Sequence, residues 1–123
     1  MSPVIAKDRL AGEVLLAFWK AHILHHAAQG PVYGLWLIEE LKHHGYHVSP
    51  GTLYPLLRRM ERYGWLKAER THRKHTKQRI PYRITAAGIA ALERIRLQAE
   101  KLHAELLARR LASEKSLRRR RRS

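Results

Sequence analysis

The chain has 123 residues and a formal net charge of +15, from 25 lysine and arginine residues against 10 aspartate and glutamate residues. It contains no cysteine, which excludes disulfides, thiol redox sensing, cysteine nucleophiles and thiolate zinc sites. No segment approaches the roughly 18 uninterrupted apolar residues of a membrane span, and the start lacks the pattern of a secretion signal. We therefore expect a cytoplasmic protein without a membrane partner. So short a chain buries only a modest core, which favours a homo-oligomer.

The positive charge is concentrated in two segments. Residues 67–83 contain seven basic residues against one acidic residue, and residues 115–123 contain six basic residues and no acidic one. A uniformly basic surface could serve solubility alone. Two concentrated basic segments in a protein that is not secreted indicate a polyanionic partner, most often nucleic acid.

The first two predicted helices follow a short arm at residues 1–10, which we expect to be flexible. Residues 11–28 predict a helix that is apolar almost all the way round between Val14 and Trp19. Such a helix needs cover on more than one side, so we expect it to pack on its own domain and on a second subunit. The residues assigned to that subunit contact are Leu15, Phe18 and Trp19. Residues 32–44 predict a second helix, which Gly45 closes.

The segment 49–63 predicts a third helix with one apolar face. Residues at positions i, i+3, i+4 and i+7 are apolar, as in a helix that lies on a core: Leu53, Leu56, Leu57 and Met60. Ser49 followed by Pro50 fits an N-cap and a first helical residue, and Gly64 fits the left-handed residue after the last turn. Pro55 leaves the start open, because a cap at Thr52 would place the ring harmlessly in the first turn, whereas a start at Pro50 would not.

The opposite face of this third helix is basic. At 100° per residue it collects a tyrosine hydroxyl and several guanidinium groups. Two helices joined by a short glycine-containing turn, the second basic on its outer face, form the helix-turn-helix pattern of DNA-binding proteins. We predict base contacts from Tyr54 and Arg58. The residues predicted to set position on the DNA, or to lie on the same face, are Ser49, Thr52, Pro55, Arg59 and Arg62.

A wing is predicted after this helix. Residues 65–70 and 80–84 each predict a short strand, with Pro81 at a strand end or edge. The loop 71–79 between them has no apolar residue. Its cations are predicted to contact the DNA backbone or minor groove: Arg73, Lys74, Lys77 and Arg79. The alternative is a solvated hairpin tip.

Thr85 is predicted to cap a last helix that runs to about residue 111. Its apolar residues alternate in steps of three and four, the seam of a coiled coil: Leu92, Ile95, Ala99, Leu102 and Leu106. We therefore assign residues 11–84 to the DNA-binding domain and residues 85–112 to a dimerisation helix. The alternative is a helix folded back on its own domain. Residues 113–123, which end in five consecutive arginines and a serine, are expected to form a disordered basic tail.

The run from Ser49 to Glu61 reads Ser-Pro-Gly-Thr-Leu-Tyr-Pro-Leu-Leu-Arg-Arg-Met-Glu and resembles the signature of the PadR family of bacterial transcriptional regulators. Gly34 with residues 37–41 upstream, and residues 82–88 downstream, extend the similarity over roughly two thirds of the chain. Leu35 departs from the family, which usually has an aromatic residue there. The resemblance implies a mainly α fold with a small β-hairpin: a winged helix-turn-helix plus a long C-terminal dimerisation helix, with residues 49–63 as the recognition helix.

The resemblance also implies that some relatives bind flat aromatic or cationic compounds near the dimer interface. Phe18 and Trp19 are therefore candidates for lining a pocket for a small aromatic effector.

Nine histidines raise the question of a metal site. Two sets have ligand-like spacing: His22 with His25 or His26, and His43 with His44 and His47. Because no cysteine supports either set and Asp8 is the only aspartate, we expect no metal site and no cofactor, and interpret them as partly buried or surface histidines. No nucleophile, histidine and carboxylate pattern and no glycine-rich phosphate loop is present, so we expect no enzyme.

These predictions combine into a dimeric repressor that places two copies of the 49–63 helix in successive major grooves of a pseudo-palindromic operator in double-stranded DNA. A non-specific or architectural nucleic-acid-binding protein is the main alternative, which the arginines at 118–122 favour. A protein-interaction module built on a winged helix is a third possibility, but it leaves the basic helix face and the basic loop unexplained.

Overall fold

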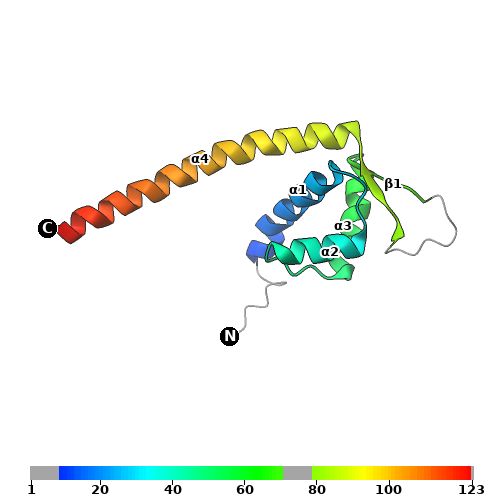
Figure 1. Cartoon of the computed structure of the whole chain (residues 1–123), viewed down its shortest axis with the longest axis horizontal. Helices are drawn as coiled ribbons and strands as arrows, with labels where there is room; N and C mark the ends of the chain where they lie inside the picture. Colours follow the sequence, from blue (N-terminus) through cyan, green and yellow to red (C-terminus); the bar gives the residue numbers. More distant parts are fainter. Residues whose placement is uncertain (1–8, 71–78, 123) are drawn as a thin grey trace. The chain divides into compact units, whose positions relative to one another are not determined.

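The computed structural model describes residues 9–70 and 79–122 (Figure 1). A π-helical segment, η2 (Ala11–Leu15), leads into the helices and strands that follow: α1 (Leu16–Ala27), α2 (Gly34–His43), α3 (Pro50–Arg62), β1 (Leu66–Ala68), β2 (Tyr82–Ile84) and α4 (Ala86–Arg122). The chain divides into two compact units, one up to Leu92 and one from Glu93 onward. The predicted fold class, mainly helical with a small β-hairpin, is confirmed.

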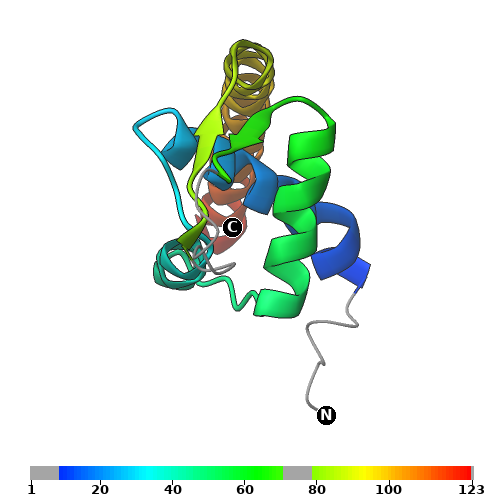
Figure 2. The ribbon, with the colours of Figure 1, turned by 90° about the vertical axis from the view of Figure 1, so that its right-hand side faces the viewer.

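The core of the first unit lies between α1, α2 and α3, and β1 closes it. In Figures 1 and 2 the axes of α2 and α3 cross steeply, as in a helix-turn-helix. The predicted apolar stripe of α3 is confirmed, since all four of its residues are fully buried. The largest fully buried side chains are Ile23, Leu24, Leu37, Leu41, Leu53, Leu56, Leu57, Met60 and Leu66.

The start of α3 is at Pro50, with Ser49 in an extended conformation before it. The Ser49 carbonyl accepts hydrogen bonds from the amides of Thr52 and Leu53, at 3.0 and 2.9 Å. The alternative start, with Thr52 as the cap, is therefore wrong. Pro55 lies inside the helix, where its ring is exposed to solvent.

Glycines end both helices of the helix-turn-helix, as predicted. Gly64 has a φ of +83°, and the amides of Gly64 and Trp65 donate to the carbonyls of Glu61 and Met60 at 2.9 and 3.0 Å. This pair of bonds is the Schellman motif, which needs a left-handed residue and so favours glycine. Gly45, with a φ of +86°, ends α2 in the same way.

The hairpin is shorter than predicted, with three residues in each strand. β1 and β2 are antiparallel, and Lys67 faces Arg83 at the centre of the register. Val32, just before α2, adds a bridge to this sheet, because its amide donates to the Tyr82 carbonyl at 2.9 Å and its carbonyl accepts from the Tyr82 amide at 2.8 Å. The hairpin is thereby tied to the chain that enters α2.

The first turn of α4 is joined to the end of α3. The Gly88 amide donates to the Thr85 hydroxyl oxygen at 3.0 Å, which confirms Thr85 as the cap. The Thr85 hydroxyl donates to the Gly64 carbonyl, and the Thr85 amide donates to the Trp65 carbonyl at 3.0 Å. A Cβ atom at Gly88 would lie 2.2 Å from the Trp65 carbonyl oxygen, so this close approach requires glycine.

The predicted change from helix to disordered tail near residue 113 is wrong. α4 has 37 residues and continues to Arg122. No glycine or proline follows Gly88 within it, and its last residues are mostly good helix formers. Arg110 and Glu114 also form an i, i+4 pair at 3.8 Å across the predicted boundary. Among the described helices, α4 included, none is both long enough and apolar enough to cross a bilayer.

Candidate nucleic-acid interface

The outer face of α3 is polar, cationic and accessible. Thr52, Pro55, Arg58 and Arg62 are exposed, and Arg59 is half-buried at the margin. Ser49, just before the helix, is exposed too, and its hydroxyl donates to the Thr52 hydroxyl at 3.2 Å. In the described parts of the chain neither Arg58 nor Arg62 forms an ion pair. Both guanidinium groups are therefore available to an anionic partner.

Tyr54 does not belong to this face, and its predicted outward position is wrong. Its side chain is only 7% exposed. The ring lies against Gly34, where an added Cβ atom would be 2.3 Å from Cε1 of the tyrosine. Its hydroxyl has no hydrogen-bond partner among the described residues, and burial raises the pKa of Tyr54. The Tyr54 side chain therefore packs between α3 and α2.

The base of the wing is attached to α3 by an ion pair that no pattern in the sequence indicates. Arg70 donates two hydrogen bonds to the Glu61 carboxylate, from Nη1 to Oε2 and from Nη2 to Oε1, each at 2.8 Å. These bonds hold the pKa of Glu61 below its usual value. Arg83 and Glu69 form a second pair across the two strands. Two of the basic residues in 67–83 thus position the hairpin within the protein.

Most of the predicted wing contacts fall outside the described part of the chain. Arg73, Lys74 and Lys77 lie outside the described residues. Arg79 is described and is exposed. Its contact with DNA stays a prediction.

A cavity of about 490 Å³ lies between the helical segment formed by η2 and α1 and the turn that enters α3. Trp19 lines it and packs edge-on against Tyr46, with ring centroids 6.2 Å apart. Phe18 is 47% exposed and does not line it. The two predicted effector residues therefore differ in position. The residues around the cavity are Gly12, Leu15, Leu16, Trp19, Gly45, Tyr46, His47, Val48, Ser49, Thr52 and Arg59.

The residues predicted to form the dimer contact are half-buried or exposed in the single chain. Leu15, Trp19, Leu92 and Ile95 are half-buried, and the exposed ones are Phe18, Ala99, Leu102 and Leu106. Leu10 and Val14 are also exposed, and with Phe18 they repeat every four residues. The N-terminal helix thus carries an exposed apolar strip.

A three-helix core, a glycine-closed turn, an exposed cationic third helix and a two-stranded hairpin define a winged helix-turn-helix protein. The model of the "Transcriptional regulator PadR-like family" matches residues 23–94. The match covers more than half of the chain and includes all of α2 and α3 and the whole hairpin. The chain belongs to the PadR-like family of transcriptional regulators.

The chain is also similar in sequence or fold to individual transcriptional regulators. The transcriptional regulator Rv3488 of Mycobacterium tuberculosis is 50% identical over 88 residues, which are 72% of this chain and 81% of that protein. A PadR-like transcriptional regulator of Bacillus cereus is 28% identical, with a TM-score of 0.65 over 80% of this chain and 93% of its own. A PadR-like transcription factor of Bacteroides fragilis has the same fold, at 24% identity and a TM-score of 0.68, over 80% of this chain and 96% of its own.

Proposed function

We propose that this protein is a dimeric, sequence-specific DNA-binding repressor that inserts α3 into the major groove. The observation that carries the proposal is the contrast between the two faces of α3. One face is fully buried, which fixes the helix in the domain, and the other presents the guanidinium groups of Arg58 and Arg62, which form no ion pair within the described chain. Arginine is the side chain that most often reads guanine in the major groove.

The residues of the face divide by their place along α3. Arg58 is at the centre of the exposed face and is assigned to base contact. The residues assigned to phosphates are Ser49, Thr52, Arg59 and Arg62, with Pro55 in van der Waals contact. Tyr54 is not among them, since it is buried. The wing cations, of which Arg79 is described, are assigned to the DNA backbone.

A homodimer would cover the open apolar surfaces of both units. The strip of Leu10, Val14 and Phe18 and the α4 seam with Leu102 and Leu106 are exposed in one chain. A second copy has the same two surfaces, which is what a two-fold interface requires. Two α3 helices about 34 to 36 Å apart would then fit successive major grooves of a pseudo-palindromic operator. The protein would act on DNA in the cytoplasm.

The cavity at Trp19 is the place we assign to a small, flat aromatic effector. Its walls include Thr52 and Arg59 of α3 as well as Trp19 of α1. A compound bound there would therefore contact both the helix assigned to dimerisation and the helix assigned to DNA. That position suits a compound that changes DNA affinity.

The test is a selection of binding sites from random DNA with the full chain, followed by binding to the selected duplex and to a scrambled one at physiological salt. A specific repressor gives an inverted repeat and prefers the selected duplex by at least about 10³-fold. Equal affinity for both duplexes would instead support a non-specific architectural binder, the alternative that the exposed arginines 118–122 favour. Binding to neither would overturn both.

A further inference from the structure

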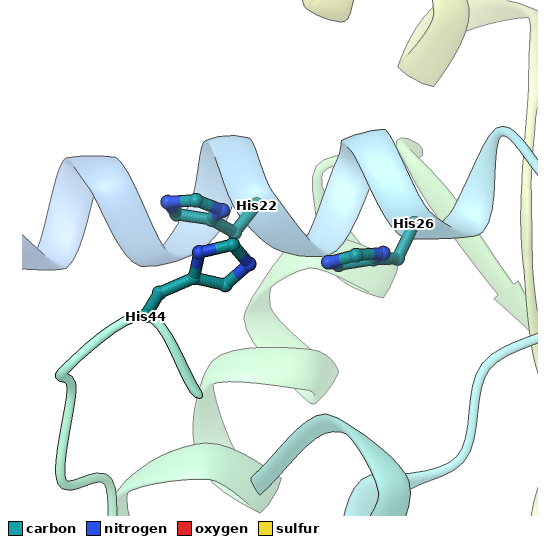
Figure 3. Close-up of side chains that lie close together, drawn as sticks. All are labelled: His22, His26 and His44. Atoms are coloured by element: carbon teal, nitrogen blue, oxygen red, sulfur yellow. The ribbon is translucent and has the colours of Figure 1, made fainter. Parts of the chain in front are cut away.

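Three histidines from two different elements come together beside the helix-turn-helix. His22 and His26 lie one turn apart on α1, and His44 lies at the C-terminal end of α2 (Figure 3). Each can present a ring nitrogen, and these three atoms all lie within 4.8 Å of one another. The ring centroids of His22 and His44 are 4.6 Å apart.

A carboxylate lies next to two of the three rings, those of His26 and His44. Oε1 of Glu40 is 3.9 Å from Nε2 of His26 and 4.0 Å from Nε2 of His44. Three imidazoles and one carboxylate together make four ligands, the number of a tetrahedral site. All four belong to the first unit, and they form two pairs of positions one helical turn apart: His22 with His26, and Glu40 with His44.

One ring nitrogen of the cluster is buried without a hydrogen bond. Nε2 of His26 is shielded from solvent and has no hydrogen-bond partner among the described residues. A buried polar atom of this kind costs free energy unless something binds it.

We propose that His22, His26, His44 and Glu40 bind one divalent transition-metal ion of the Zn²⁺, Co²⁺ or Ni²⁺ type. Imidazole nitrogens suit these ions, whereas Mg²⁺ and Ca²⁺ prefer oxygen ligands. Metal–nitrogen bonds of about 2.0 to 2.1 Å place tetrahedral ligand atoms about 3.3 Å apart. Ligand atoms that lie up to 4.8 Å apart must therefore close by up to about 1.5 Å. Rotation of side chains allows this movement, because the His44 side chain is 43% exposed.

The metal would join α1 to the end of α2. His44 directly precedes Gly45, whose left-handed conformation turns the chain toward α3. Tyr46 and Trp36 pack edge-on against His22 and His26, with centroids 5.4 and 5.2 Å apart, and they limit the rings' freedom. A bound ion therefore fixes the position of α1 against the helix-turn-helix. This site does not depend on the proposed DNA contacts.

The experiment uses the full chain, stripped with a chelator and titrated with Zn²⁺ by calorimetry and with Co²⁺ by visible absorption. We expect one strong site per chain, d–d bands of tetrahedral intensity for Co²⁺, and a rise in Tm of roughly 5 to 10 °C with excess Zn²⁺. Only weak binding of several ions per chain, spread over the nine histidines, would overturn the proposal.

The neighbouring histidines provide matched controls. His44→Ala is expected to weaken Zn²⁺ binding by at least about tenfold, and Glu40→Gln by about 10- to 100-fold. His43→Ala and His25→Ala should bind as the wild type does, since His25 is 3.1 Å from the Gln29 side-chain nitrogen and outside the cluster. His44 is exposed, so its variant should fold, which circular dichroism checks. The assignment would be refuted if His43→Ala lost Zn²⁺ binding, or if His44→Ala bound Zn²⁺ as tightly as the wild type.

Discussion

Tyr54 and Gly34 form a contact that fixes how α2 and α3 cross. The tyrosine ring occupies the space that any side chain at residue 34 would need. The first residue of α2 therefore has to be glycine for a packing reason, although its φ is unexceptional. The ring therefore contributes to the packing of the domain, and any influence on the proposed DNA contacts would come through the angle of α3.

Gly34→Ala is expected to destabilise the protein. The added methyl group would overlap the Tyr54 ring, and overpacking of this kind costs about 1 to 3 kcal/mol. Urea unfolding followed by circular dichroism measures the change. Gly51→Ala is the control, since its new Cβ atom would meet only Ser49 Oγ at 3.8 Å. Gly51 is also in a first helical turn, so its change should be neutral or slightly stabilising. Equal destabilisation by both would contradict the contact.

Arg58→Ala is expected to cost about 1 to 3 kcal/mol of binding to the selected duplex and to relax the preference at one base position. The reason is that the guanidinium group would no longer donate two hydrogen bonds to a guanine. Arg62→Ala should weaken all duplexes alike, because a phosphate contact carries no sequence information. Electrophoretic mobility shifts over a set of single-base operator variants distinguish the two. Identical profiles would mean that the two arginines have the same role.

At the scale of elements, the α4 seam can be tested separately from the DNA face. Leu102→Glu is expected to convert the dimer to a monomer, because it places a charge in an apolar helix interface. Light scattering coupled to size exclusion measures the mass. Ala104→Glu makes the same change in charge on an exposed position away from the seam, and it should leave the dimer intact. A dimer that survives Leu102→Glu would exclude the seam as the main interface.

Features that depend on local pattern could be predicted from the sequence. The buried stripe of α3, the glycine at 64 and the cap at Thr85 each follow from neighbouring residues, and all three agree with the structure. The position of Tyr54 could not, because this residue lies between the two faces of α3. The ring packs inward because Gly34 on α2 leaves the space that it occupies.

Contacts between distant segments could not be predicted. Glu61 and Arg70 meet because the chain reverses at Gly64, and no sequence pattern relates them. His44 joins His22 only through the packing of α2 on α1, and their spacing in the sequence does not relate them. The end of α4 differs from expectation for another reason: like charges at the terminus predict disorder, whereas helix propensity and the lack of a breaker favour continuation.

For the whole molecule, the main question is how much the net charge of +15 contributes to affinity for the operator and how much to affinity for any DNA. Removal of the arginines at 118–122 is expected to lower affinity for scrambled DNA steeply at low salt. The slope of log K against log salt should fall by up to about 0.9 for each phosphate that the tail no longer neutralises. Affinity measured from low to physiological salt gives both values.

Replacement of all five arginines with lysine is the control for that deletion. It keeps the charge, so it should retain most of the non-specific affinity and of the salt slope. The preference for the operator over scrambled DNA should change little on deletion, because phosphate contacts carry no sequence information. An unchanged affinity for scrambled DNA would show that the terminal arginines do not touch the duplex.

The corner where Thr85 and Gly88 meet the end of α3 has a mechanical implication. Its hydrogen bonds and the close approach of Gly88 to the Trp65 carbonyl oxygen restrict movement between the end of α3 and the first turn of α4. We therefore expect the end of α3 and the first turn of α4 to move together within the first unit. A rotation of the first turn of α4 should then change the tilt of α3, the helix that we propose contacts DNA.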